Sequence, residues 1–268
     1  MSPDRFQNLD PAQSVKVLPR HLAGPGPTSL GTAWPFPFDE DWRVYQSEKG
    51  TAFTTSPCMR LWSSFTPEPD KSRKGAWTTE ANRHGGLPFG HATWQITFDA
   101  TTPVELLHDV HTELLDLYHE DLHSDRDGLF EDMTAPHEAY ASLFAFGWRH
   151  HVKTDGTQSF LSPDDLAGVV HHYAATRSHE PAWRIWGGHP SEPQWQARFT
   201  TGTPTTLVAA LTVSMISSEP LIRTVNEVPL DTRSHLYLAT PTDTPPAERP
   251  IAQLPPGHGT GPGTSRSR

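Results

Sequence analysis

An internal repeat constrains the fold of this chain more than any other feature does. Residues 42–57 align with residues 148–163 at an offset of 106 positions. After a loss of five residues from the second copy, the alignment continues at an offset of 101. Matches that keep their order indicate a tandem duplication, and two copies are too few for a solenoid. Ala76-Trp77 matches Ala182-Trp183 at the offset of 106; at the offset of 101 the matches are Trp94-Gln95 with Trp195-Gln196, Phe98 with Phe199, and Thr102-Pro103 with Thr203-Pro204.

Each copy is predicted to contain short strands followed by one helix. Lys49-Gly50 lies between two β-rich runs, and Gly in a two-residue turn is a strong hairpin signal. Further strands are predicted at 59–65, 77–81 and 93–98, with counterparts at 166–173, 183–186 and 195–199. The predicted fold class is therefore α+β, with two pseudo-symmetric tandem repeats, each an antiparallel meander of four or five strands followed by one α-helix.

The Thr-Pro pair that closes the strands of each copy predicts a helix start. We expect Thr102 to cap the first helix, with Pro103 at its first position and Glu105 completing a capping box. Apolar residues then recur at helical spacing, which gives this helix one apolar face. The second helix, through residues 207–216, is apolar nearly all round. We therefore expect it to be buried on two sides, between the copies.

Composition predicts the organisation outside the repeats. The residues from 241 onward are rich in Pro, Gly and Thr and too poor in apolar residues to offset the entropy of ordering. The predicted units are a flexible N-terminus (1–14), a first sheet-helix repeat (15–121), an acidic linker (122–135), a second sheet-helix repeat (136–220), a C-terminal extension (221–240) and a disordered tail (241–268).

Charge limits the classes of partner. The chain has 21 Lys and Arg against 31 Asp and Glu, a formal net charge of −10, which taken alone argues against nucleic acid. Residues 105–138, however, contain eleven acids and one base, so this stretch alone carries −10. The excess negative charge therefore lies in one helix and the linker. It neither excludes nor supports binding of nucleic acid by the sheets.

Cysteine content and hydropathy favour a soluble cytoplasmic protein with no membrane partner. There is one cysteine, and neither a signal peptide nor an apolar run long enough to span a bilayer is recognisable. Cys58 is expected to be a small buried residue of a strand. No G-x-S-x-G elbow or other catalytic motif is present, so we expect no enzyme activity.

Alternation along the strands predicts a surface of arginine and aromatic side chains. Strand neighbours point to opposite sides of a sheet, so if Trp42, Met59 and Trp77 face the helix, their neighbours face away. Such a surface can stack unpaired bases and pair with phosphates. Alternatively, the two faces pack against each other or against a second chain. The candidate nucleic-acid-binding residues are Arg43, Tyr45, Arg60, Trp62, Arg149, Arg184, Trp186 and Arg198, and a basic loop at 71–74 is a further candidate phosphate contact.

Histidine spacing raises the question of a metal site. His108 and His111 have a helical spacing that places both rings on one face, as do His119 and His123. Further ligands would have to come from acids such as Glu105. Solvated helix residues explain the same pattern without a metal, so we predict no metal and no cofactor.

Several short runs carry a resemblance to a known family. They are Pro19 to Gly26, Ser162-Pro163-Asp164, Ala182 to Ile185, and the Trp-x-x-x-Phe and Thr-Pro runs that close both copies. These runs resemble an actinobacterial family, known from streptomycete proteins, whose domain of unknown function commonly occurs in two copies. The resemblance covers residues 15–217 and implies no activity. Two successive sheet-then-helix units are also similar in plan to the PC4-like and Whirly single-stranded DNA-binding folds, although fold analogy alone does not establish function.

The sequence therefore predicts a non-catalytic protein that binds single-stranded DNA or RNA through its arginine and aromatic sheet faces. The alternative is a protein-interaction or assembly module. In that case the acidic helix and linker would contact a basic protein partner or mediate self-association.

Overall fold

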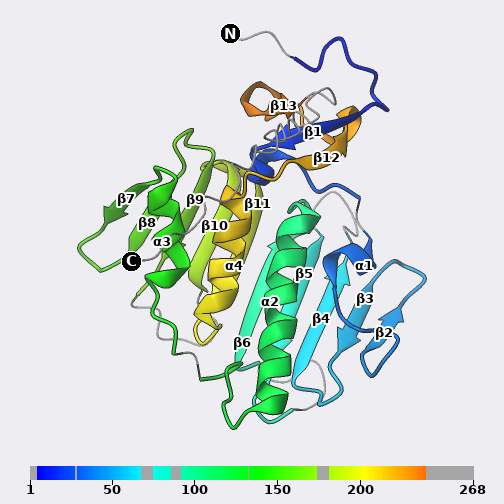
Figure 1. Cartoon of the computed structure of the whole chain (residues 1–268), viewed down its shortest axis with the longest axis vertical. Coiled ribbons are helices and arrows are strands. Elements are labelled where there is room, and N and C mark those ends of the chain that lie inside the picture. Colours follow the sequence, from blue (N-terminus) through cyan, green and yellow to red (C-terminus); the bar gives the residue numbers. More distant parts are fainter. Residues whose placement is uncertain are drawn as a thin grey trace, which may run out of the picture.

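The two copies contribute five strands each to the computed structural model (Figure 1). The structure describes residues 5–27, 29–67, 75–85, 92–131, 133–173 and 181–239. The first copy forms β2 (Arg43–Gln46), β3 (Ala52–Thr55), β4 (Leu61–Thr66), β5 (Ala76–Ala81) and β6 (Trp94–Asp99). The second forms β7 (Arg149–Val152), β8 (Gln158–Leu161), β9 (Ala167–His171), β10 (Pro181–His189) and β11 (Glu192–Thr200).

All ten of these strands belong to one antiparallel sheet. Their order is β2-β3-β4-β5-β6-β11-β10-β9-β8-β7, so each copy is a meander and the last strands of the two copies meet at the centre. There β6 pairs with β11 through Phe98 with Ala197, Thr97 with Arg198 and Ile96 with Phe199. The predicted α+β class with antiparallel strands is confirmed.

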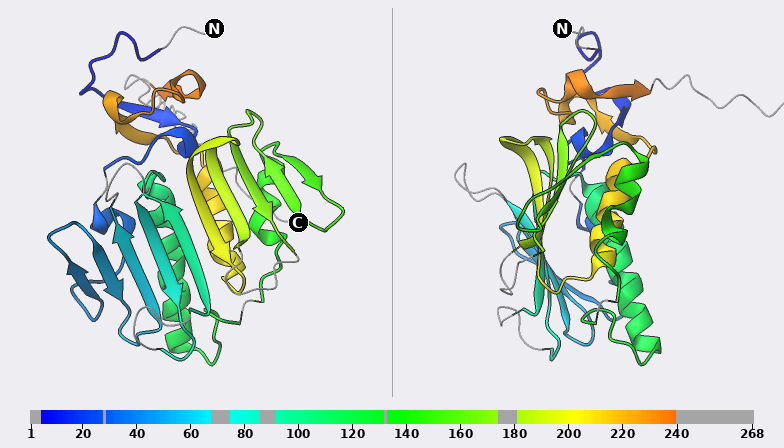
Figure 2. Two further views of the ribbon diagram at one scale, coloured as in Figure 1. Left: turned by 180° about the vertical axis from the view of Figure 1, so that it is seen from behind. Right: turned by 90° about the vertical axis from the view of Figure 1, so that its left-hand side faces the viewer.

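The four α-helices of the described residues cover one face of this sheet (Figure 2). They are α1 (Leu30–Ala33), α2 (Val104–His123), α3 (Glu138–Ala145) and α4 (Thr205–Ile216). As expected from its apolar circumference, α4 packs between α2 and α3. The sheet and helices enclose one hydrophobic core that both copies share, and the rings of Phe98 and Phe199 meet edge to face at 6.0 Å across the central strands. The short helices α1 and α3 have no counterpart in the predicted element pattern.

The predicted capping box at the start of α2 is wrong. The helix begins at Val104, and Pro103, with φ −52° and ψ 125°, lies outside it as the cap residue without a side-chain hydrogen bond. Thr102 belongs to the preceding turn, where its backbone N–H donates to Asp99. Glu105 has a different role, because it binds an arginine of another element.

The turn before the third strand of each copy corrects the placement of Cys58 and Met59. Met59 has a left-handed backbone (φ 56°) and is 52% exposed, and Cys58 is also exposed, so β4 begins only at Leu61. The Ser56 hydroxyl accepts the N–H of Leu61 and holds this turn. The second copy has the same turn at the offset of 106. Asp165 has a left-handed backbone, and the Ser162 hydroxyl accepts the N–H of Ala167.

A separate three-stranded sheet lies at one end of the molecule (Figure 1). Its central strand β1 (Ser14–Leu18) pairs with β12 (Leu221–Thr224) and β13 (Tyr237–Ala239). Residues 15–18, which the predicted boundaries place in the first repeat, therefore pair with the C-terminal extension. The N-terminus, predicted to be flexible, contributes the buried Phe6 to the small core of this sheet. The predicted disordered tail, 241–268, lies outside the described residues.

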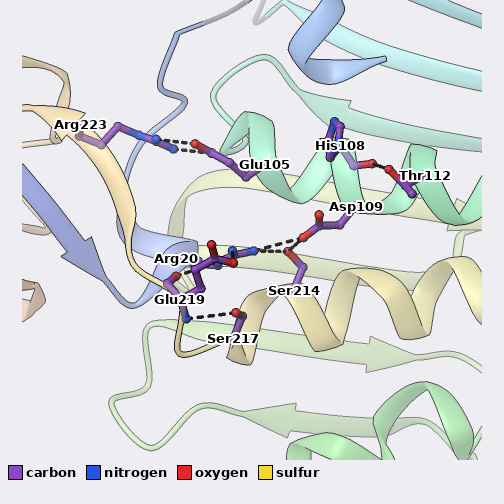
Figure 3. A network of polar contacts seen from close by, with 9 residues as sticks. All are labelled: Arg20, Glu105, His108, Asp109, Thr112, Ser214, Ser217, Glu219 and Arg223. Atoms are coloured by element: carbon purple, nitrogen blue, oxygen red, sulfur yellow. Dashed lines mark hydrogen bonds and ion pairs between the residues drawn. The ribbon is translucent and has the colours of Figure 1, made fainter. Parts of the chain in front are cut away.

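Two buried arginines connect the small sheet to the helices (Figure 3). Arg223 on β12 is 1% exposed, and its two Nη atoms donate to the Glu105 carboxylate of α2 at 2.6 Å each. Arg20, after β1, donates to Asp109 of α2 at 3.2 Å and to Glu219 at 3.0 Å. A buried charge is costly without its partner. These pairs therefore help to fix the position of the small sheet against α2.

Two histidines of α2 hold α1 in place. His108 Nδ1 donates to Thr32 O at 2.8 Å, and His111 Nδ1 donates to Ala33 O at 2.8 Å. Because Nδ1 of His111 carries the proton, its Nε2 is an acceptor, and the Thr79 hydroxyl at 3.0 Å donates to it. Burial lowers the pKa of His111 to about 4, so the ring is neutral at neutral pH.

We expect Glu105→Met to destabilise the protein by about 3–5 kcal/mol in chemical denaturation, because it leaves the Arg223 guanidinium buried and unpaired. The double variant Glu105→Met with Arg223→Met should recover much of this loss, since both charges are then removed. A single variant as stable as the wild type, or a double variant less stable than the single one, would contradict this role for the ion pair.

We also expect His111 to make folding sensitive to acid. Its pKa is lower in the folded state (about 4) than in the unfolded chain (6.5), so its contribution is complete above pH 6.5 and is lost as the pH falls towards 4. The loss is on the order of 3 kcal/mol. His111→Gln keeps a donor and an acceptor but does not titrate, so its unfolding free energy should fall less over this range. If the free energy of unfolding fell by the same amount in both proteins between pH 6.5 and pH 4, His111 would not be the source of the acid sensitivity.

Candidate functional site

One side of the ten-stranded sheet is not covered by any described helix (Figure 2). Strand register assigns residues to this side: Arg43 lies opposite Thr55, Tyr45 opposite Phe53, and Arg198 opposite Thr97. The alternate positions hold buried tryptophans that face the helices. We define the open face as the uncovered side of the sheet with Arg43, Tyr45, Phe53, Trp62, Glu80, Gln95, Thr97, Arg149, Arg184, Trp186, Gln196 and Arg198.

The two copies present their outward residues on the same side of the molecule. Because β6 pairs edge to edge with β11, the outward faces are continuous and cannot pack against each other. The alternative that the two faces bury one another is therefore wrong. Packing against a second chain stays open.

Aromatic side chains form a row on the first-copy half of the open face. Tyr45 stacks on Phe53 at 4.7 Å between ring centroids, and Phe53 lies 6.4 Å from Trp62. Tyr45 is 47% exposed and Phe53 is 38% exposed. Three adjacent strands thus each contribute one ring. Phe53 is absent from the predicted set, although the hairpin register at Lys49-Gly50 places it opposite Tyr45.

Arginines dominate the second-copy half of the open face. Arg184 on β10 and Arg198 on β11 lie directly opposite each other, and both are exposed. Like charges at opposed positions of a sheet are destabilising. Arg149, near the outer edge, pairs with Asp165, but both side chains are more than half exposed, so water screens this pair. This half of the face therefore favours an anion.

Two of the predicted residues are engaged by other residues of the chain. Trp186 is only 7% exposed. Its indole packs against Gly168, where an added Cβ would come within 2.1 Å of the ring, and the Arg184 guanidinium carbon lies 5.6 Å from the ring centroid. Arg60 forms an ion pair with Asp127 of the linker and lies 4.7 Å from the Phe130 ring centroid. The predicted basic loop, 71–74, lies outside the described residues.

Four of the eleven acids in the acidic stretch form ion pairs with arginines among the described residues. Asp127 pairs with Arg60 and Arg83, and Glu131 also pairs with Arg83. Earlier in the stretch, two acids of α2 hold the buried arginines of the small-sheet region. These four carboxylates therefore stabilise contacts between elements and are not free for a partner.

Three of the candidate metal ligands have other partners. His108 and His111 donate to the carbonyls of α1, and Glu105 binds Arg223. His119 and His123 are exposed on α2. Within the part of the chain that the structure describes, no three His, Cys, Asp or Glu side chains gather in a way that could hold a metal ion.

Comparison with known proteins identifies two similar regions in this chain. Residues 55–119 and 161–221 match the family model described as SPDY: Domain of unknown function (DUF317). Searches of curated proteins and of solved structures gave no match, so the likeness to PC4-like and Whirly folds and the actinobacterial origin stay predictions. Among the described helices, none is long and apolar enough to cross a membrane. The chain therefore contains two regions similar to one domain of unknown function, consistent with the predicted tandem duplication.

Proposed function

We propose that the open face binds single-stranded nucleic acid and that the protein is a non-catalytic cytoplasmic binding protein. The observation that carries the proposal is the exposed, directly opposed pair of Arg184 and Arg198 on the same uncovered sheet as the aromatic row. A bound phosphate would relieve the repulsion between these two guanidinium groups.

The two halves of the open face would have different roles. Tyr45, Phe53 and Trp62 offer flat rings on adjacent strands, and every base can stack on such rings regardless of sequence. Arg184 and Arg198 offer charge for the backbone. Base stacking therefore falls to the first copy and phosphate binding to the second. We further propose that an approximate twofold axis between β6 and β11 relates the copies, so that one strand of nucleic acid crosses both.

The second candidate function is assembly through the acidic surface of α2. Asp116 and Glu120 are exposed there, and the pKa of Glu113 is raised by burial and by these two neighbouring carboxylates. Such a surface would attract a basic protein. We place this function second because four of the eleven acids of the stretch already pair with arginines of the same chain.

Fluorescence anisotropy with a labelled oligothymidylate of about 20 nucleotides tests the first function, and the affinity should fall as salt rises. Trp62→Ala should weaken binding by about 1–3 kcal/mol, the usual contribution of one stacked base. Arg184→Gln with Arg198→Gln should reduce the dependence of log K on log salt by about 0.7 for each phosphate that the arginines no longer neutralise.

Arg126→Gln is the matched control, because Arg126 is an exposed arginine of the segment after α2 and is not a residue of the open face. This variant should bind like the wild type. If the wild type fails to bind DNA or RNA at low salt, or if all the variants bind equally, the first function is excluded. Light scattering over a salt series then tests the second, which requires an assembly that high salt dissolves.

A further inference from the structure

A groove of about 630 Å³ lies where the second copy meets the small sheet. Its wall includes two exposed rings, those of Phe146 (54% exposed) and Tyr237 (69% exposed). The buried residues Trp148, Met215 and Leu236 also line it. Large apolar side chains exposed in a hollow are typical of a surface that binds a partner. None of the wall residues belongs to the open face, so the groove is independent of the proposed nucleic-acid site.

The chain itself contains a segment whose pattern suits an aromatic groove. In residues 240–268, the only large apolar side chains are Ile251 and Leu254, in the run Pro-Ile-Ala-Gln-Leu-Pro-Pro at 250–256. Prolines favour the polyproline II helix, which has three residues per turn, so residues i and i+3 lie on one face. Ile251 and Leu254 would therefore point in the same direction. Proline-rich segments in this conformation bind in grooves lined by aromatic side chains.

The connection to β13 brings this segment within reach of the groove. Tyr237 lines the groove, and β13 ends two residues later, at Ala239. Ile251 follows twelve residues after Ala239, and twelve extended residues span at most about 40 Å. A short tether holds a segment at an effective concentration on the order of 1 mM. The same segment of a second copy would match that value only in a very concentrated solution, so the intrachain segment is the favoured occupant.

We propose that residues 250–256 bind in this groove of their own chain, with Ile251 and Leu254 packed against Phe146 and Tyr237. Residues 240–268 as a whole are too poor in apolar residues to build a core, but a short run can become ordered on a surface that is already folded. Binding would cover two exposed rings and two apolar anchors together, and the hydrophobic effect would favour it.

The double variant Ile251→Ser with Leu254→Ser, in the full chain, removes both anchors and leaves the described core unchanged. A fluorescein-labelled peptide of residues 245–258 should bind this variant, as read by fluorescence anisotropy. The wild type should bind the peptide about tenfold more weakly, because its own tethered segment competes at on the order of 1 mM. The matched control is the chain with Ala252→Ser and Gln253→Ser, which changes the other faces of the segment and should behave like the wild type.

Hydroxyl-radical footprinting of the full chain tests the groove itself. Phe146 and Tyr237 should be oxidised several-fold more slowly in the wild type than in the variant without the anchors. Adding Phe146→Ser to that variant should abolish binding of the labelled peptide. Adding Leu122→Ser should not, because Leu122 is an apolar residue of similar exposure (56%) on α2 that does not line the groove.

Equal oxidation of the two rings with and without the anchors, or failure of the peptide to bind the variant, would overturn the proposal. Protection of the rings in the wild type that grows with chain concentration would place the segment of a second copy in the groove, which would overturn the intrachain assignment. These outcomes are separate from binding of nucleic acid by the open face, which the labelled oligonucleotide measures.

Discussion

The pairing of β6 with β11 is the interaction on which the rest of the structure depends. Without it, each copy would be a five-stranded sheet with a free inner edge, and free edges invite uncontrolled pairing with other chains. With it, Phe98 and Phe199 meet in one shared core. The same pairing places α2 and α4 side by side and aligns the outward side chains of both copies on a single surface.

Much of the fold could be predicted from the sequence because the two copies show the same pattern of strands, turns and one helix. The turn at Ser56 and its repeat at Ser162 bracket equivalent strands, and alternation assigns Tyr45 and Arg198 to the correct face. Contacts between distant segments were not predictable. Trp186 packs in the space left by the missing side chain at residue 168, and Arg60 pairs with Asp127, far along the chain. The small sheet likewise depends on pairing between opposite ends of the sequence.

The net charge of −10 acquires a structural meaning from these contacts. Glu105 and Asp109 on α2 bind the buried Arg223 and Arg20, so they help to hold the small sheet against the helices. Asp127 and Glu131 bind arginines at the ends of neighbouring strands. These four acids therefore lie on α2 and in the segment that follows it, while the exposed arginines of β10 and β11 lie on the open face.

Hydroxyl-radical footprinting, read by mass spectrometry, tests the central claim most directly: that the chain presents one continuous open face and binds nucleic acid there. In the free chain, Tyr45, Phe53 and Trp62 should be oxidised readily, whereas Trp77 and Trp94 should be protected by the core. Adding a single-stranded oligonucleotide should then protect the rings of the aromatic row. The account would be contradicted if Tyr45, Phe53 and Trp62 resisted oxidation in the chain without nucleic acid. It would also be contradicted if their oxidation did not change when nucleic acid was bound.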